Sequence, residues 1–120
     1  MKYLLACLEK DSNNEISEVF ARATYFAIYD TEKKNFTYKE NAAASASSGA
    51  GVKAAQEVID SNIDKVIARR LGENSFDILK ASEIEVLTAK ADLSLSEEVA
   101  LASNNLLEPM LSGKVGFHHA

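Results

Sequence analysis

The sequence predicts a single α/β domain built on a mixed five-stranded sheet with helices on both faces, in three layers. Its 120 residues suit one domain, and 47% of them are apolar, enough for a substantial core. A continuously apolar run, Tyr3–Leu8, is typical of a central strand covered on both faces. In the second half, short apolar runs alternate with amphipathic segments, which favours parallel strands joined by right-handed helical crossovers.

Two segments after the first strand predict a β-hairpin. Thr24–Asp30 and Asn35–Asn41 are rich in aromatic and β-branched residues, and the polar sequence TEKK separates them. The polar side chains of Lys39 and Glu40 suit an exposed sheet edge. The hairpin therefore supplies the one antiparallel strand of the expected sheet.

The segment after the hairpin, Ala42–Gly51, contains only small residues, and we expect a flexible loop. A helix is predicted next, with strands at Ile63–Ala68 and Ile84–Leu87 on either side of a second helix that Asn74 caps. The apolar positions expected to face the core are Val52, Ala55, Val58 and Ile59 in the first helix, and Phe76 and Leu79 in the second.

The spacing of Ser94 and Glu97 predicts a capping box at the start of a last helix. Its apolar face is expected to comprise Val99, Ala102, Leu106 and Met110, and Pro109 should kink or end it. We therefore expect one domain over residues 1–112, followed by a frayed tail over residues 113–120.

Composition excludes several classes of protein. Asp and Glu outnumber Lys and Arg by 18 to 13, which disfavours a nucleic-acid-binding surface. The single cysteine, Cys7, excludes a disulfide within the chain. No stretch approaches the roughly 18 apolar residues of a membrane helix, and the apolar run in MKYLLACLEK is too short for a signal peptide. We expect a cytoplasmic protein that binds neither nucleic acid nor membrane.

The predicted sheet directs attention to one edge. Open α/β sheets bind ligands beyond the carboxyl ends of their strands, where the strand order reverses. That edge should carry Glu9–Arg22, Ser48–Val52 and Arg69–Asn74. Arg69 and Arg70 lie between a strand and a helix start, where guanidinium groups and helix N–H groups can hold an anion.

Three motifs along this edge carry a family resemblance: ISEVFARATYF (16–26), GAGVKAAQ (49–56) and VIARRLGENSFDILK (66–80). In this order they resemble the dinitrogenase iron–molybdenum cofactor biosynthesis family, the NifX-like proteins, over about residues 1–90. The matching positions are Ser17, Glu18, Phe20, Arg22, Ala23, Tyr25 and Phe26 in the first motif; Gly49, Gly51, Ala54, Ala55 and Gln56 in the second; and Arg70, Gly72, Asn74 and Phe76 in the third.

The resemblance implies a ribonuclease-H-like fold and a non-enzymatic protein that carries or assembles a metal–sulfur cluster. The cluster would be of the iron–molybdenum, iron–sulfur or molybdenum–copper type, with cofactor-assembly proteins as partners. The ligand would be the cluster itself or a related oxo- or thio-anion. The residues expected to shape the site are Arg22, Gly49, Gly51, Arg69, Arg70 and Gly72.

Two departures from the family pattern bear on how a cluster would be held. Val19 stands where the family has a histidine, so direct ligation by imidazole is lost at that position. Arg69 replaces a family glycine and adds a positive charge. Binding is therefore expected to rest on arginine and backbone N–H contacts. Cys7 could ligate a soft metal such as Cu(I), and His118 and His119 could bind metal loosely.

Each candidate also has a structural interpretation. Arg69 and Arg70 could pair with a carboxylate such as Asp77, and Arg22 with Glu18 or Glu15. Gly49 and Gly51 could form a plain turn at a helix start, and Cys7 could be a small core residue. An interaction module that keeps the fold but has lost the cofactor is the alternative function. An enzyme is disfavoured, because both histidines lie in the tail and no acid–base pair can be assembled.

Overall fold

The structure is a computed structural model that describes residues 1–113. Its five strands are β1 (Lys2–Cys7), β2 (Tyr25–Asp30), β3 (Asn35–Glu40), β4 (Lys65–Ala68) and β5 (Glu85–Thr88). Its helices are α1 (Ala50–Asp60), α2 (Glu73–Ala81), α3 (Leu95–Ser103) and a short 3₁₀ helix, η1 (Ala42–Ser45). Among these residues, no helix is both long and apolar enough to span a bilayer.

The five strands form one mixed sheet in the order β3-β2-β1-β4-β5. β1 pairs with β2 in antiparallel register and with β4 in parallel register, and β5 continues the parallel half. Only β2 runs against the others, so the mixed five-stranded sheet with one antiparallel strand is confirmed. Lys39 and Glu40 are exposed on the edge strand β3, as expected.

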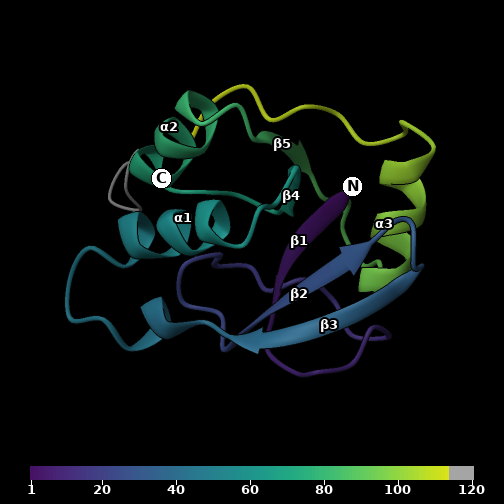
Figure 1. The fold of residues 1–120 in the computed structure, drawn as a ribbon, viewed down its shortest axis with the longest axis horizontal. Coiled ribbons are helices and arrows are strands. Elements are labelled where there is room, and N and C mark those ends of the chain that lie inside the picture. Colours follow the sequence, from purple (N-terminus) through teal and green to yellow (C-terminus); the bar gives the residue numbers. More distant parts are fainter. Residues whose placement is uncertain (114–120) are drawn as a thin grey trace.

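Figure 1 shows the three layers, with α1 and α2 on one side of the sheet and α3 on the other. β1 explains this arrangement, because its side chains alternate between two buried faces. Leu4 and Ala6 join the core under α1 and α2, whereas Tyr3, Leu5 and Cys7 join the core under α3. A run of apolar residues without polar interruption is what a strand buried on both faces requires.

The small-residue segment after the hairpin is more ordered than predicted. Asn41 is buried, and its Oδ1 accepts a hydrogen bond from the Ala43 N–H at 3.1 Å, which caps η1. The Asn41 Nδ2 donates to the carbonyls of Ala21 and Ala23 at 3.0 and 2.9 Å. Ala43 is thereby held in the core with 1% of its surface exposed. The expectation of a loop over Ala42–Gly51 was therefore partly wrong, since only residues 46–49 lie outside a helix.

The predicted apolar face of α1 was partly wrong. Val52 is 46% exposed, and the helix instead buries Ala50, Ala54, Ala55 and Val58. Ala55 and Val58 were predicted correctly, and Ile59 is half-buried against the same core. The small side chain of alanine allows α1 to pack closely against the sheet and α2. The buried face of the helix is therefore formed mainly by alanines, and the larger Val52 lies outside it.

The start of α2 and the end of α3 also differ from the prediction. Gly72, not Asn74, is the N-cap of α2, and Asn74 is exposed within the helix. α3 ends at Ser103, since Asn104 caps it and Asn105 adopts a left-handed φ of 58°. The predicted helical face was therefore too long, and Leu106 is 56% exposed beyond it.

Pro109 lies in an extended segment beside β5 rather than in a helix. It forms an isolated antiparallel bridge with Leu87, and the Met110 N–H donates to the Val86 carbonyl at 2.8 Å. Gly113 then lies against the start of α2, where an added Cβ would come within 2.6 Å of the Glu73 Cα. The remainder of the predicted tail, including His118 and His119, lies outside the described residues.

The predicted capping box of α3 is confirmed. The Ser94 hydroxyl accepts from the Glu97 N–H at 3.1 Å, and the Glu97 carboxylate accepts from the Ser94 N–H at 2.9 Å. The loop after β1 is attached to the same turn, because the Leu95 N–H donates to the Asn14 carbonyl at 2.9 Å. The cap therefore stabilises both α3 and the loop that leads to the carboxyl edge of the sheet.

We predict that Ser94→Ala lowers the free energy of unfolding by about 1 kcal/mol, because the N3 amide loses its acceptor. Urea unfolding followed by circular dichroism measures the change. Ser96→Ala, an exposed position in the first turn of α3, is the matched control and should shift stability by less than about 0.5 kcal/mol. Equal effects of the two substitutions would contradict a specific role for the cap.

Candidate functional site

The candidate site lies at the carboxyl ends of β1 and β4, where the chain leaves the two central strands in different directions. β1 continues through a long loop to β2, and β4 continues directly to α2. The loop is held at this edge because the Ser17 N–H donates to the Ala6 carbonyl at 2.8 Å. This is the edge that the sequence predicts for a ligand site.

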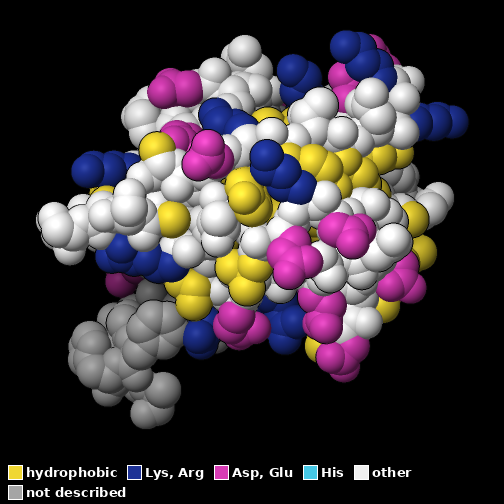
Figure 2. All heavy atoms as spheres, turned by 90° about the horizontal axis from the view of Figure 1, so that it is seen from below, with side chains coloured by type: hydrophobic (Ala, Val, Ile, Leu, Met, Phe, Trp, Pro, Cys, Tyr) yellow, Lys and Arg dark blue, Asp and Glu magenta, His cyan; other side chains and the backbone are white. Residues whose placement is uncertain are grey.

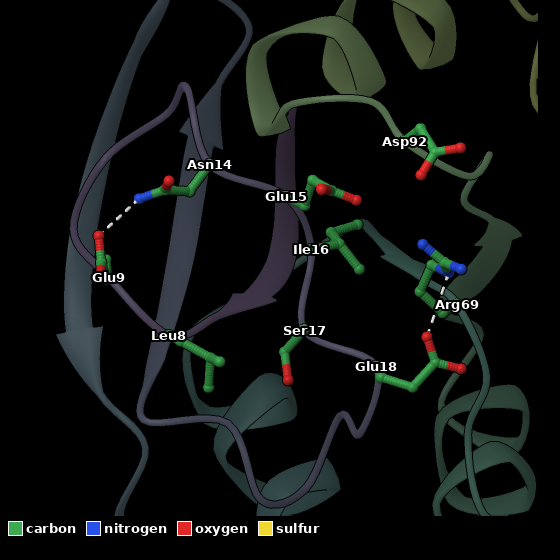
Figure 3. A pocket seen from close by; sticks show the side chains of 9 residues that line it. All are labelled: Leu8, Glu9, Asn14, Glu15, Ile16, Ser17, Glu18, Arg69 and Asp92. Carbon is green, nitrogen blue, oxygen red and sulfur yellow. Dashed lines mark hydrogen bonds and ion pairs between the residues drawn. The ribbon is translucent and has the colours of Figure 1, made fainter.

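A hollow of about 500 Å³ opens at this edge. Carboxylates outnumber the single lining arginine four to one, and Figure 3 shows Glu18 and Asp92 on two sides of the Arg69 guanidinium. The loop side of the hollow is fixed by a hydrogen bond from the Asn14 amide to Glu9 at 2.9 Å. The lining residues are Leu8, Glu9, Asn14, Glu15, Ile16, Ser17, Glu18, Arg69 and Asp92.

Arg69 and Arg70 meet at one carboxylate. The Nε atoms of Arg69 and Arg70 lie 3.5 and 3.8 Å from the two Glu18 carboxylate oxygens. The two arginines are partly buried, whereas the Glu18 side chain is 56% exposed. The structure therefore brings the two predicted arginines together, and the acid on which they converge is Glu18 rather than Asp77.

Arg22 does not point toward this pair. Its Nη1 donates to the carbonyls of Ala44 and Ala46 at 3.2 and 2.6 Å. These contacts stabilise the turn that follows η1, and they replace the predicted pairing with Glu18 or Glu15. Arg22 therefore stabilises the loop that leads into α1.

The three predicted glycines surround the starts of α1 and α2. Gly49 is the N-cap of α1 and adopts a left-handed φ of 68°, which favours glycine. A Cβ at Gly51 would lie 2.6 Å from the Ser75 Oγ, so Gly51 allows the two helix starts to approach closely. An added Cβ at Gly72 meets nothing within 4 Å, and the backbone there is accessible beside Arg70.

Cys7 lies in the core beneath α3 and has no exposed surface. Burial raises the pKa of its thiol to about 11, and a hydrogen bond with the Glu9 backbone offsets only part of that effect. A protonated, enclosed thiol is a poor metal ligand, so the structure favours the small-core-residue interpretation. Within residues 1–113, no group of three or more His, Cys, Asp or Glu side chains is placed to hold a metal ion.

Glu98 is a buried acid that the sequence interpretation missed. It lies on α3 with no exposed surface, and its Oε1 accepts from the Lys90 N–H at 3.2 Å. Burial raises the pKa of the Glu98 carboxyl, while the Lys90 N–H and the positive charge of Arg69 act in the opposite direction. Helical spacing contained the signal, since Leu95, Glu98 and Ala102 recur at intervals of three and four residues.

Comparisons with known proteins agree with this fold. The chain matches the family described as "Dinitrogenase iron-molybdenum cofactor" over residues 1–105. Among curated proteins, none matches the chain significantly. The family match covers most of the chain, so the protein belongs to the dinitrogenase iron–molybdenum cofactor family.

Two solved structures illustrate the similarity. A Thermotoga protein provisionally described as NifB is 32% identical with a TM-score of 0.80, and the alignment covers 94% of this chain and 96% of that one. The apo form of the orange protein from Desulfovibrio gigas has a TM-score of 0.88 at 21% identity, covering 94% and 95% of the two chains. The first supports the family, and the second shows that the fold is shared.

We predict that Cys7 does not react with iodoacetamide in the native protein at pH 8 but reacts on unfolding in urea, because the thiol is buried and protonated. Mass spectrometry of the alkylated protein measures this difference. The variant Cys7→Ala should load as much metal as the wild type. Rapid native alkylation, or a loss of metal in Cys7→Ala, would restore Cys7 as a candidate ligand.

We also predict a pH effect from Glu98. Its folded-state pKa lies above the ordinary value of 4.5, so above that value the folded protein retains a proton that the unfolded chain has lost. Stability from this group therefore falls as pH rises from about 4.5 through the raised pKa.

Urea unfolding of wild type and Glu98→Gln across this range isolates the effect, because the other carboxyl groups titrate in both proteins. The difference in unfolding free energy should shift with pH in favour of Glu98→Gln as the wild-type carboxyl ionises. A difference that does not vary with pH would show that Glu98 titrates normally.

Proposed function

We propose that this chain is a non-enzymatic carrier or assembly protein for an iron-, molybdenum- or copper-containing sulfide cluster. The observation that carries the proposal is the convergence of Arg69 and Arg70 at the carboxyl end of β4, directly before α2. Membership of the dinitrogenase iron–molybdenum cofactor family supports the choice of ligand.

The chemistry of the edge suits an anion held without direct ligation. Metal–sulfide clusters and thiometallates carry negative charge, and guanidinium groups form strong charge-assisted hydrogen bonds with such ligands. The N-cap of α2, Gly72, lies two residues after Arg70, and the N–H groups and positive dipole end of this helix add to the attraction. Gly49 and Gly51 belong to the neighbouring start of α1 and can contribute backbone N–H groups there.

The chain as a whole is acidic, so two adjacent arginines at the end of a central strand are a distinctive feature of it. Figure 2 shows one face on which Asp and Glu side chains gather in the lower right part of the view. Net charge of −5 repels anions from most of the surface. An anionic ligand is therefore expected to concentrate at the arginine pair.

The two side chains near this edge that could act as nucleophiles support a carrier rather than an enzyme. The Ser17 hydroxyl donates its hydrogen bond to the Val19 carbonyl at 3.3 Å, and the Cys7 thiol is enclosed in the core. Leu8 lines the hollow and is 61% exposed, and Val19, which follows Glu18 in the sequence, is 37% exposed. We propose that these two exposed apolar side chains contact cofactor-assembly proteins, which deliver or receive the cluster in the cytoplasm.

The test is to purify the protein anaerobically from a host supplied with iron, molybdenum and copper. Metal analysis and a visible absorption spectrum of the same sample should show bound metal together with sulfide-to-metal charge-transfer bands. Protein isolated without metal should take up tetrathiomolybdate, alone or with Cu(I). Protein that is metal-free and also fails to take up these species would contradict the proposal and favour an interaction module.

Binding should depend on both arginines. We predict that Arg69→Ala or Arg70→Ala weakens tetrathiomolybdate binding by about tenfold or more, because each removes a charge-assisted contact. Equilibrium dialysis with molybdenum analysis measures the affinity. Lys33→Ala, which removes an exposed charge in the hairpin turn, is the matched control and should leave it unchanged. Unchanged binding in both arginine variants would place the ligand elsewhere.

A further inference from the structure

The carboxylate of Glu18 occupies the place where an anionic ligand of the arginine pair would bind. One oxygen lies 3.5 Å from the Arg69 Nε and the other 3.8 Å from the Arg70 Nε. A single acid thus faces two consecutive arginines, and Figure 3 shows the Glu18 side chain extending from the loop toward Arg69. A ligand that uses both guanidinium groups must replace this carboxylate.

We propose that Glu18 is a built-in competing anion, which holds the arginine pair when no cluster is present and swings away when a multiply charged anion binds. The inference rests on the proposed function and adds a residue that sets the affinity of that site. A monoanion such as chloride gains little by displacing a tethered carboxylate, since the tether keeps the carboxylate at high effective concentration. A ligand with two or more charges gains more from the same two arginines.

The loop around Glu18 allows this exchange without unfolding. Ser17 is fixed to β1 through its N–H, and Phe20 is buried, with its ring 5.3 Å from that of Phe26. Between these two anchors the Glu18 side chain is more than half exposed. A change of rotamer is therefore sufficient to free the arginines, and the flanking residues stay in place.

Arg69 has a second acidic side chain on the side away from Glu18. Asp92 lines the same hollow, and Figure 3 shows its carboxylate on that side of the Arg69 guanidinium. When the Glu18 side chain moves away, an acidic group therefore still faces Arg69 from the opposite wall of the hollow.

The variant Glu18→Gln tests the inference with tetrathiomolybdate as the probe. It preserves the size of the side chain but removes the competing charge, and we expect binding to become about three- to tenfold tighter. Glu32→Gln makes the same change of charge at an exposed position in the hairpin turn, outside the lining of the hollow, and should increase affinity by less than about twofold. Thermal unfolding of each variant checks that the fold is intact.

The double variant Glu18→Gln/Arg70→Ala separates displacement from a general effect of charge. If Glu18 competes for the arginines, the gain from Glu18→Gln should shrink when Arg70 is absent. An equal gain in both backgrounds would mean that Glu18 only repels the anion at a distance, which overturns the inference.

The outcomes for the two proposals differ. If the wild type binds tetrathiomolybdate and Glu18→Gln binds it with equal or lower affinity, the proposed role of Glu18 is overturned and the carrier function is left intact. Failure of wild type and Glu18→Gln alike to bind tetrathiomolybdate, alone or with Cu(I), would overturn both.

Discussion

The burial of β1 on both faces is the constraint on which the rest of the structure depends. Leu4 and Ala6 must be covered on one side, and Tyr3, Leu5 and Cys7 on the other, so helices are needed on both faces. β1 has an antiparallel neighbour in β2 and a parallel one in β4, and the chain therefore diverges at its carboxyl end. The hollow and the arginine pair lie at that divergence, so the five buried apolar residues of β1 determine where the candidate site lies.

The carboxylates and arginines at the carboxyl edge of the sheet determine which ligands can bind there. Four carboxylates line the hollow, and the two arginines at the end of β4 converge on one of them, Glu18. The same contact serves stability and function in opposite ways. As an exposed ion pair it contributes little to folding, but as an occupant of the anion site it sets the threshold that a ligand must exceed.

The strands and the edge at which the hollow opens could be predicted from the sequence, because both follow from local patterns. Tyr3–Leu8 is uniformly apolar, and TEKK separates two β-rich segments. The contacts of the site could not be predicted, since they join residues distant in sequence. Nothing near Arg22 indicates that it donates to the carbonyls of Ala44 and Ala46, more than 20 residues away. The buried face of α1 was missed for a related reason: tertiary packing selected Ala50 and Ala54 over Val52.

The most direct test of the central claim is an NMR titration that follows arginine side-chain Nε–H signals while tetrathiomolybdate is added to labelled protein. The account predicts that the Arg69 and Arg70 signals shift together and saturate, while the Arg22 signal, held by loop carbonyls, changes little. Binding that leaves the Arg69 and Arg70 signals unchanged would contradict it.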